Sequence, residues 1–374
     1  MILAGRRFRA PARAVAVALC VVCGSACGDR TPAVVGIAMG SDTVTPRAIL
    51  PARQQRFNDS ASARHHVALR YTATVPDTVL NPALAWANEL VRIPGLVGVV
   101  GHESSRSALQ AAPVYRERRV VQIVPTGTSS ELSTVSPWTF PLVASDASQG
   151  VLLAQYLVGT GRKRVTLFVQ DDEYGRGIVS SVKRALNGTD VRILENVMHT
   201  PASDYELLVR SVMSHDPKPD ALLFITQGGI AARVAKLAWR RDSTLLLLGT
   251  DAVNTAASDL RALAPSNGRI ALATYWFPDS SKKETQEFLR DFRASHLAGD
   301  PQWHHAALYD AVGLLDAAVA EVGASPSAVR GWLLSLGRNR PAYHGVLGPI
   351  DFTGNHAIPA RLVRPSATGW ELVK

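Results

Sequence analysis

The sequence has few cysteines, few aromatic residues and, in its main body, no long apolar run. Its three cysteines, Cys20, Cys23 and Cys27, all lie near the start of the 374 residues. The rest of the chain therefore has no disulfide, thiol nucleophile or cysteine metal site. Aromatic residues make up 6%, which fits aliphatic layers of strands and helices better than a β-sandwich. Beyond Cys27, no stretch is long and apolar enough to span a bilayer.

Recognisable enzyme motifs are also missing. The sequence contains no G-x-S-x-G elbow and no P-loop. The segment that begins at Gly175 lacks the third glycine of the dinucleotide fingerprint. Arg106 stands where a zinc-protease motif beginning at His102 needs its second histidine. We therefore expect a protein that is not an enzyme, with no cofactor and no metal.

The charge balance gives no sign of a nucleic-acid partner. The formal net charge is +9, but four of the 40 basic residues precede residue 14. Without them, 36 basic residues face 31 acidic ones over the whole remaining chain. No run of basic residues with interleaved aromatics is present, so nucleic-acid binding is not expected.

The N-terminal segment has the pattern of an export signal. Four arginines without an acid are followed by the apolar run Ala14–Val22, then by small residues up to Ala26, and then by Cys27. This order is typical of a secretory signal peptide, which we assign to residues 1–26. It resembles a bacterial lipoprotein signal, which implies that Cys27 carries lipid and that residues 27–33 form a lipidated tether. Ordinary cleavage after Ala26, giving an unanchored periplasmic protein, is the alternative.

After this segment, apolar β-rich runs alternate with helical patterns, which predicts two parallel sheets with helices on both faces. The expected strands cover residues 34–39, 66–73, 97–101, 120–124, 164–170, 191–197, 221–226, 245–248 and 270–275. The expected helices cover residues 81–92, 105–118, 148–159, 177–186, 203–214 and 229–240.

Sheets of this kind bind ligands at the carboxyl ends of their strands, close to helix N-termini. The loop with Ser104 and Ser105 precedes an expected helix, so its hydroxyls and free N–H groups suit a carboxylate, although the serines could simply cap the helix. The loop with Thr126 and Thr128 offers the same chemistry. Asp251 ends an apolar strand and suits an ammonium group, or else caps the following turn.

Several motifs in the expected order resemble the branched-chain amino-acid-binding family, the type I periplasmic binding proteins of ABC transporters. Val124–Leu132 is similar to the family's Ser-Pro-x-x-Thr-x-x-Glu-Leu, and Phe140–Gly150 is similar to its crossover motif. Asp172–Gly177 resembles D-x-x-Y-G-x-G with one residue fewer in the first gap. Tyr309 opens the family's late helix, and His344–Gly354 resembles its terminal glycine motif.

The resemblance implies roles for particular residues. Ser104, Ser105, Thr126 and Thr128 resemble the site for an amino acid's α-carboxylate. The remaining ligand positions that it implies lie on the opposing lobe: Tyr174 as the aromatic residue, Asp251 as the acid for the α-ammonium, and Gln227 near a position that is often aromatic.

The resemblance also implies two α/β lobes joined by three crossings, with the ligand between them. We expect lobe one to comprise residues 34–145 and 275–343, and lobe two residues 146–274 and 344–374. The implied function is that of an extracytoplasmic, membrane-anchored lipoprotein that binds an amino-acid-like molecule and presents it to an ABC permease. A ligand sensor or receptor of the same fold is the alternative.

Overall fold

The protein is described by a computed structural model. The described residues are 32–40, 44–60, 65–73, 78–263, 268–354, 358–367 and 369–373. The predicted signal peptide, the lipidation site at Cys27 and nearly all of the predicted tether lie outside these residues.

The first sheet contains five parallel strands in the order β2-β1-β3-β4-β5. They are β1 (Ala33–Ala38), β2 (Val67–Tyr71), β3 (Leu96–Gly101), β4 (Val121–Val124) and β5 (Thr139–Pro141). The central strands are buried along their whole length because helices cover both faces. The elements with this sheet are α1 (Val44–Asp59), α2 (Pro82–Leu90), α3 (Ser105–Arg118), η1 (Ser130–Ser133), α9 (Lys283–Ala294), α10 (Trp303–Val322) and α11 (Pro326–Ser335).

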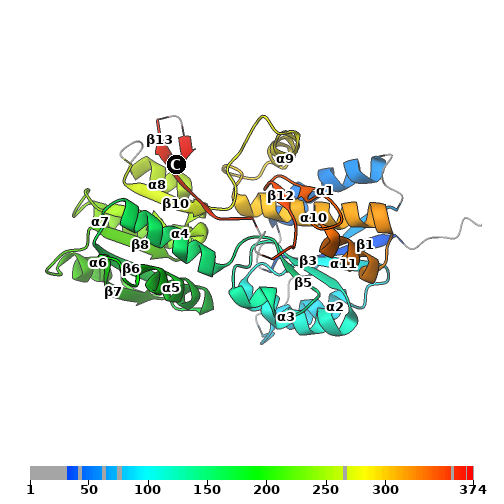
Figure 1. Cartoon of the computed structure of the whole chain (residues 1–374), viewed down its shortest axis with the longest axis horizontal. Coiled ribbons are helices and arrows are strands. Elements are labelled where there is room, and N and C mark those ends of the chain that lie inside the picture. The colour runs from blue at the N-terminus through cyan, green and yellow to red at the C-terminus, as the bar shows by residue number, and fades with distance from the viewer. Residues whose placement is uncertain are drawn as a thin grey trace, which may run out of the picture. The chain divides into compact units, whose positions relative to one another are not determined.

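The second sheet has seven strands in the order β14-β13-β10-β9-β8-β6-β7. They are β6 (Arg164–Gln170), β7 (Arg192–His199), β8 (Ala221–Ile225), β9 (Leu246–Gly249), β10 (Ile270–Thr274), β13 (Arg361–Ser366) and β14 (Gly369–Leu372). Strands β6 to β10 are parallel, as predicted, whereas β13 and β14 add an antiparallel edge that the sequence analysis did not predict (Figure 1).

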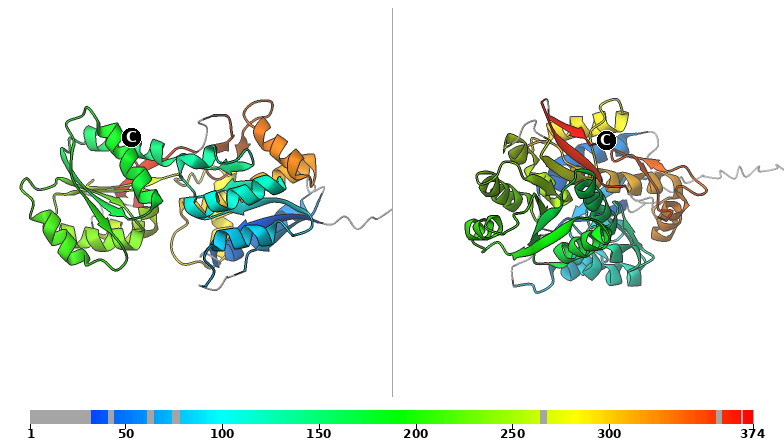
Figure 2. Two further views of the ribbon diagram at one scale, coloured as in Figure 1. Left: turned by 90° about the horizontal axis from the view of Figure 1, so that it is seen from below. Right: turned by 60° about the vertical axis from the view of Figure 1, so that its left-hand side comes forward.

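Helices lie on both faces of the second sheet (Figure 2). On one face, Leu153 of α4 and Ile178 of α5 share a buried cluster with Leu167 of β6. On the other face, α6 and α7 pack against Phe168 and Phe224. This arrangement confirms the predicted doubly wound α/β class. The elements are α4 (Asp146–Gly159), α5 (Glu173–Leu186), α6 (Tyr205–Met213), α7 (Gly228–Trp239), η2 (Asp251–Ala256) and α8 (Ala257–Leu263).

The chain passes between the two sheets three times. It leaves the first sheet after β5, returns after β10, and passes to the second sheet again before β13. The small hairpin of β11 (Tyr343–His344) and β12 (Pro349–Ile350) precedes this last passage. Val346, Ile350 and Ile358 belong to the core cluster of the first sheet, although the expected division places them in lobe two. The division into lobes stays a prediction, with its last boundary better drawn near residue 358.

Helices α5, α10 and α1 are among those that differ from the sequence predictions. Helix α5 begins at Glu173 rather than Gly177, because the Asp172 side chain accepts a hydrogen bond from the N–H of Gly175 and caps the helix. Helix α10 begins at Trp303, so Tyr309 lies inside it and does not open it. Helix α1 was not predicted; Pro51 lies inside it and its apolar pattern is weak.

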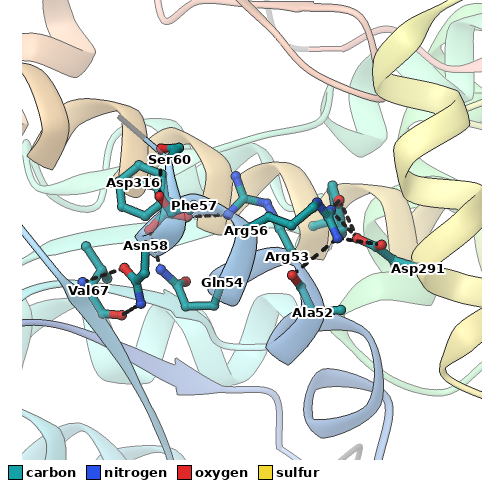
Figure 3. A network of polar contacts seen from close by, with 11 residues as sticks. Ala52, Arg53, Gln54, Arg56, Phe57, Asn58, Ser60, Val67, Asp291 and Asp316 are labelled. Atoms are coloured by element: carbon teal, nitrogen blue, oxygen red, sulfur yellow. Dashed lines mark hydrogen bonds and ion pairs between the residues drawn. The ribbon is translucent and has the colours of Figure 1, made fainter. Parts of the chain in front are cut away.

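A buried polar network joins α1 to α9 and α10 (Figure 3). Arg53 forms an ion pair with Asp316, whose side chain is 1% exposed, and Gln54 donates to the same carboxylate at 3.2 Å. Arg56 pairs with Asp291 and also donates to the Tyr309 hydroxyl at 2.8 Å. Burial disfavours the charged guanidinium, but Asp316, Tyr343 and Tyr309 together outweigh it and raise the pKa of Arg53. The network holds the three helices together through paired charges.

The long helix α10 is almost wholly buried, as expected for a core helix. Over the described residues, no single helix combines the length and apolar character needed to cross a membrane. Helices α10 and α11 meet such a criterion only as a pair bent by 107°.

Candidate functional site

The two serines before α3 have different surroundings. Ser104 is exposed and is the N-cap of the helix, with its hydroxyl accepting a hydrogen bond from the N–H of Ser107 at 3.2 Å. Ser105 is half-buried, and its oxygen accepts the backbone N–H groups of Thr128 and Ser129, each at 3.0 Å. These two bonds use the Ser105 oxygen as an acceptor and leave its own proton for donation to a ligand. The structure therefore gives Ser104 the capping role and favours Ser105 as the carboxylate contact.

The predicted threonines also differ. Thr126 donates to the backbone oxygen of Glu103 at 2.6 Å, so its hydroxyl proton is already used within the chain. Thr128 is 3% exposed and lies against Asp146, the first residue of α4. The loop after β4 thus meets the start of α3 on one side and the start of α4 on the other.

Tyr174 and Asp251 lie together at the second sheet. The Tyr174 hydroxyl donates to Asp251 Oδ1 at 2.7 Å, and Gln149 Nε2 donates to the same oxygen at 2.9 Å. The N–H of Asp251 donates back to Gln149 Oε1 at 3.1 Å. The Asp251 carboxylate is 4% exposed and is therefore held by neutral donors in a nearly dry environment.

A second carboxyl group lies beside this cluster. Burial raises the pKa of Asp146 to about 7; the Thr128 hydroxyl opposes the rise, and the charges of Asp251 and Asp172 add to it. Burial likewise raises the pKa of Asp251, against the hydrogen bonds from Tyr174 and Gln149. Within the described ranges, neither Asp146 nor Asp251 forms an ion pair. The charge of Asp251 thus acts on Asp146, and among the described residues neither acid has a cation as its partner.

Four residues of this cluster were not predicted: Asp146, Gln149, Tyr275 and Trp303. The Tyr275 hydroxyl accepts from Gln149 Nε2 at 3.1 Å and donates to the backbone oxygen of Ala144 at 2.8 Å. Trp303 Nε1 donates to the backbone oxygen of Asp251 at 3.2 Å. The sequence contained a signal for two of them, because Asp146 and Gln149 are the acid and the glutamine of the crossover motif Phe140–Gly150.

Besides Ser104 and Thr126, Gln227 is a predicted residue that lies outside the cluster. It is exposed and is the N-cap residue of α7, without a side-chain hydrogen bond to the helix. Ser105, Thr128, Tyr174 and Asp251 are linked instead, through Asp146 and Gln149.

An ion pair joins the helices that carry these residues. Arg106, next to Ser105, binds Glu173, next to Tyr174, through Nε to Oε2 at 2.7 Å and through the terminal nitrogen to Oε1 at 3.0 Å. The two helices belong to different sheets, so this contact spans the predicted binding site.

A cavity of about 730 Å³ adjoins this cluster, beside the first and last passages between the sheets. Its lining includes Gly127 and Ser129, which flank Thr128, and Ser145 and Ala147, which flank Asp146. None of the seven predicted ligand residues lines it. Over the described residues, no three side chains of His, Cys, Asp and Glu gather as a metal site would require.

Two doubly wound sheets with linked polar residues at the carboxyl ends of their strands define a two-lobed ligand-binding protein. The family model described as periplasmic binding protein matches residues 74–364, and the chain therefore belongs to this family.

Individual relatives agree with this assignment. The chain is 25% identical over 260 residues to an amino acid binding protein of Pseudomonas aeruginosa, covering 68% of each chain. It is 26% identical over 193 residues to Leu/Ile/Val-binding protein homolog 1 of Brucella melitensis, covering 49% of this chain and 52% of that one. The chain thus spans about half the length of the Brucella relative.

A solved structure shows the same fold. The branched-chain amino acid transporter substrate binding protein LivJ from Streptococcus pneumoniae, in complex with isoleucine, superposes with a TM-score of 0.76 at 18% identity. The match covers 92% of this chain and 99% of that one. The resemblance inferred from the sequence motifs and the predicted fold class are therefore confirmed, as is the class of function, a periplasmic binding protein.

Proposed function

We propose that this chain is the extracytoplasmic substrate-binding protein of an ABC importer and that it carries a free amino acid, or a close analogue, to a membrane permease. The observation that carries the ligand class is the pair of buried acids, Asp146 and Asp251, without an ion-pair partner in the described part of the chain. An enzymatic role is not part of the proposal.

A ligand ammonium supplies the charge that this pair lacks. Neutral donors from Tyr174 and Gln149 support a carboxylate, but they do not offset its charge. An ammonium group near Asp251 would favour the ionised form of both acids, since an opposite charge within a few ångströms lowers the pKa of a carboxyl group. Binding energy would then come from relieving the mutual repulsion of the two acids.

The other end of an amino acid fits the start of α3. Its first turn offers free backbone N–H groups, and the helix dipole favours an anion there. Ser105 contributes a hydroxyl proton, and Thr128 lies between this helix and Asp146. Thr128 thus lies between the groups proposed to bind the ligand's carboxylate and those proposed to bind its ammonium. A free amino acid carries both of these charges.

The relatives support the same ligand class. The Pseudomonas protein bears the name amino acid binding protein, and the solved Streptococcus protein holds isoleucine. We extend the proposal to the anchor: Cys27 is the lipid attachment site, which holds the two lobes outside the cytoplasm at a membrane surface.

The test compares one amino acid with its deaminated analogue. A thermal-shift screen of residues 28–374 against the twenty L-amino acids first identifies a ligand, because a molecule that binds only the folded state stabilises it. Calorimetry is then done with that amino acid and with its carboxylic acid lacking the amine. Asp251→Asn should weaken amino-acid binding by about 3 kcal/mol, roughly 100-fold, and change binding of the deaminated acid far less.

Asp259→Asn is the matched control, because Asp259 is exposed on α8, eight residues further along the chain. It should leave both affinities unchanged. Equal amino-acid affinity in the parent and Asp251→Asn would refute the ammonium role. Asp251 would then have only a structural role as the first residue of η2, and an amine-free ligand would be favoured.

A further inference from the structure

Three neighbouring strands of the second sheet end in polar residues. Gln170 is the last residue of β6 and pairs with His199, the last residue of β7. Thr226 directly follows Ile225, the last residue of β8, which pairs with Val169 of β6. The register therefore places Gln170, His199 and Thr226 side by side at the carboxyl edge of the sheet.

These residues share one face of the sheet. Residues paired in register on parallel strands point to the same side, and side chains two positions apart do so as well. The preceding residues on this face, Phe168 of β6, Val197 of β7 and Phe224 of β8, belong to the apolar core beneath α6 and α7. On this face, each of the three polar side chains thus lies at the carboxyl end of its strand, next to a buried apolar residue.

Several of their polar atoms are buried without a hydrogen-bond partner among the residues that the structure describes. His199 is 2% exposed and Thr226 is 0% exposed. Within this part of the chain, both ring nitrogens of His199, the Thr226 hydroxyl and Gln170 Oε1 lack a partner. Buried polar groups in proteins are nearly always paired. Four unpaired polar atoms in one row therefore indicate a missing hydrogen-bonding partner more strongly than a single one would.

Neighbouring residues hold two of these groups in place. Gln170 Nε2 donates to Asp172 Oδ2 at 2.7 Å, which fixes the amide and leaves its oxygen as the open acceptor. The His199 ring packs edge-on against Tyr205, with ring centres 5.6 Å apart. Burial lowers the pKa of His199, so its neutral ring offers one donor and one acceptor.

The row lies directly beneath the surface, at the edge that also carries the proposed ligand residues. Asp171, which follows Gln170, and Gln227, which follows Thr226, are both exposed. Tyr174 belongs to the helix that begins three residues after Gln170. A ligand bound at Tyr174 and Asp251 therefore lies at the same sheet edge as the row.

We propose that Gln170, His199 and Thr226 form a subsite that receives an uncharged hydrogen-bonding group of the ligand, a carboxamide or a hydroxyl. This inference rests on the proposed function and narrows its ligand class. The row has a neutral mixture of donors and acceptors, which matches a group that both donates and accepts. An aliphatic side chain would leave these atoms unpaired, which a buried site disfavours.

The experiment uses two pairs of amino acids with similar shapes and different polarity. L-asparagine is compared with L-leucine, and L-threonine with L-valine, by calorimetry on residues 28–374. The polar member of at least one pair should bind at least tenfold more tightly. Thr226→Val and His199→Phe keep the side-chain shape or the aromatic packing, and each should remove most of that preference.

Thr166→Val is the matched control. Thr166 lies on the same face of β6, is 0% exposed and also has a buried hydroxyl without a partner, but it is four residues from the carboxyl edge. Its substitution should leave the preference intact. The comparison of the two pairs on the parent protein needs no variant, so poor folding of a variant does not prevent the test.

The outcomes separate the two proposals. If leucine and valine both bind as tightly as their polar counterparts, the subsite is refuted while the proposed amino-acid carrier stands. A preference that Thr226→Val and His199→Phe leave unchanged also refutes the subsite, and enclosed water then satisfies the row. If no free L-amino acid binds, the proposed function and this inference fall together.

Discussion

Arg106 and Glu173 form a two-point ion pair between α3 and α5, with nitrogen-to-oxygen distances of 2.7 and 3.0 Å. Each residue is directly next to a proposed ligand contact, Ser105 in one case and Tyr174 in the other. Among the ion pairs of the described residues, only this one links a helix of the first sheet to a helix of the second. Ligand binding between the lobes should therefore depend on it.

Reversing one charge of this pair should weaken ligand binding. Arg106→Glu and Glu173→Arg should each lower the affinity about two- to fivefold, because exposed ion pairs contribute little and are screened by salt. The double exchange should restore most of the loss at low ionic strength. Calorimetry at two salt concentrations measures both effects.

A similar pair within one lobe provides the control. Arg176 and Asp171 lie 2.8 Å apart with comparable exposure, but both belong to the second sheet's side of the molecule. Charge reversal there should leave ligand affinity unchanged. If the two reversals have equal effects, or if the double exchange restores nothing, the bridging role is wrong.

The serines before α3 should contribute unequally. Ser105→Ala removes a hydroxyl that also accepts two backbone N–H groups, so it should cost about 1.5–3 kcal/mol of binding free energy for an anionic ligand group. Ser104→Ala removes a helix cap and should lower the stability by about 1 kcal/mol with little effect on binding. Thermal unfolding and calorimetry separate the two. Comparable loss of affinity in both variants would contradict the assignment.

The buried pair of Arg53 and Asp316 should matter for stability rather than binding. Asp316→Ala leaves a guanidinium that is 13% exposed without its partner, which should lower the free energy of unfolding by about 3–5 kcal/mol. Glu206→Gln, at an exposed ion pair with Arg241, should change it by less than about 1 kcal/mol. Urea denaturation measures both, and a small effect of Asp316→Ala would show that the network is dispensable.

Cys27 should be the lipid attachment site. Cys27→Ser should release the protein from membranes or block its maturation, because a single thiol after the small residues carries the anchor. Membrane fractionation and mass spectrometry of the mature N-terminus measure this. A Cys27→Ser protein that matures normally and stays with membranes would rule the anchor out.

Sequence alone predicted the fold because its signals are local. The apolar runs that form β1, β3, β6 and β8, and the cap at Ser104, depend on neighbouring residues only. Helix α1 escaped prediction because Pro46 and Pro51 interrupt a weak apolar pattern. The antiparallel edge of β13 and β14 depends on pairing with β10, which no local pattern encodes.

The site was predictable only in part, for the same reason. Motifs indicated Ser105, Thr128, Tyr174 and Asp251, but the bond between Gln149 and Asp251 joins residues 102 positions apart. Nor did the sequence distinguish Ser104 from Ser105, because both precede the same helix and only tertiary packing places Thr128 over one of them. The row of Gln170, His199 and Thr226 likewise requires the strand order of the sheet.

The most direct measurement of the central claim is the number of protons released when an amino acid binds. Burial raises the pKa of Asp146 to about 7, so part of its population is protonated near neutral pH. A ligand ammonium should lower this pKa, so binding should release a proton from Asp146 and affinity should rise as the pH increases from about 5 to 7.

Calorimetry of the screened amino acid at pH 7, in buffers with different ionisation enthalpies, gives the proton count. The account predicts release of a measurable fraction of a proton per ligand in the parent and clearly less in Asp146→Asn. Tight binding of an amino acid with no proton release, and with the same pH dependence in both proteins, would contradict the claim that the paired acids receive the ligand's ammonium.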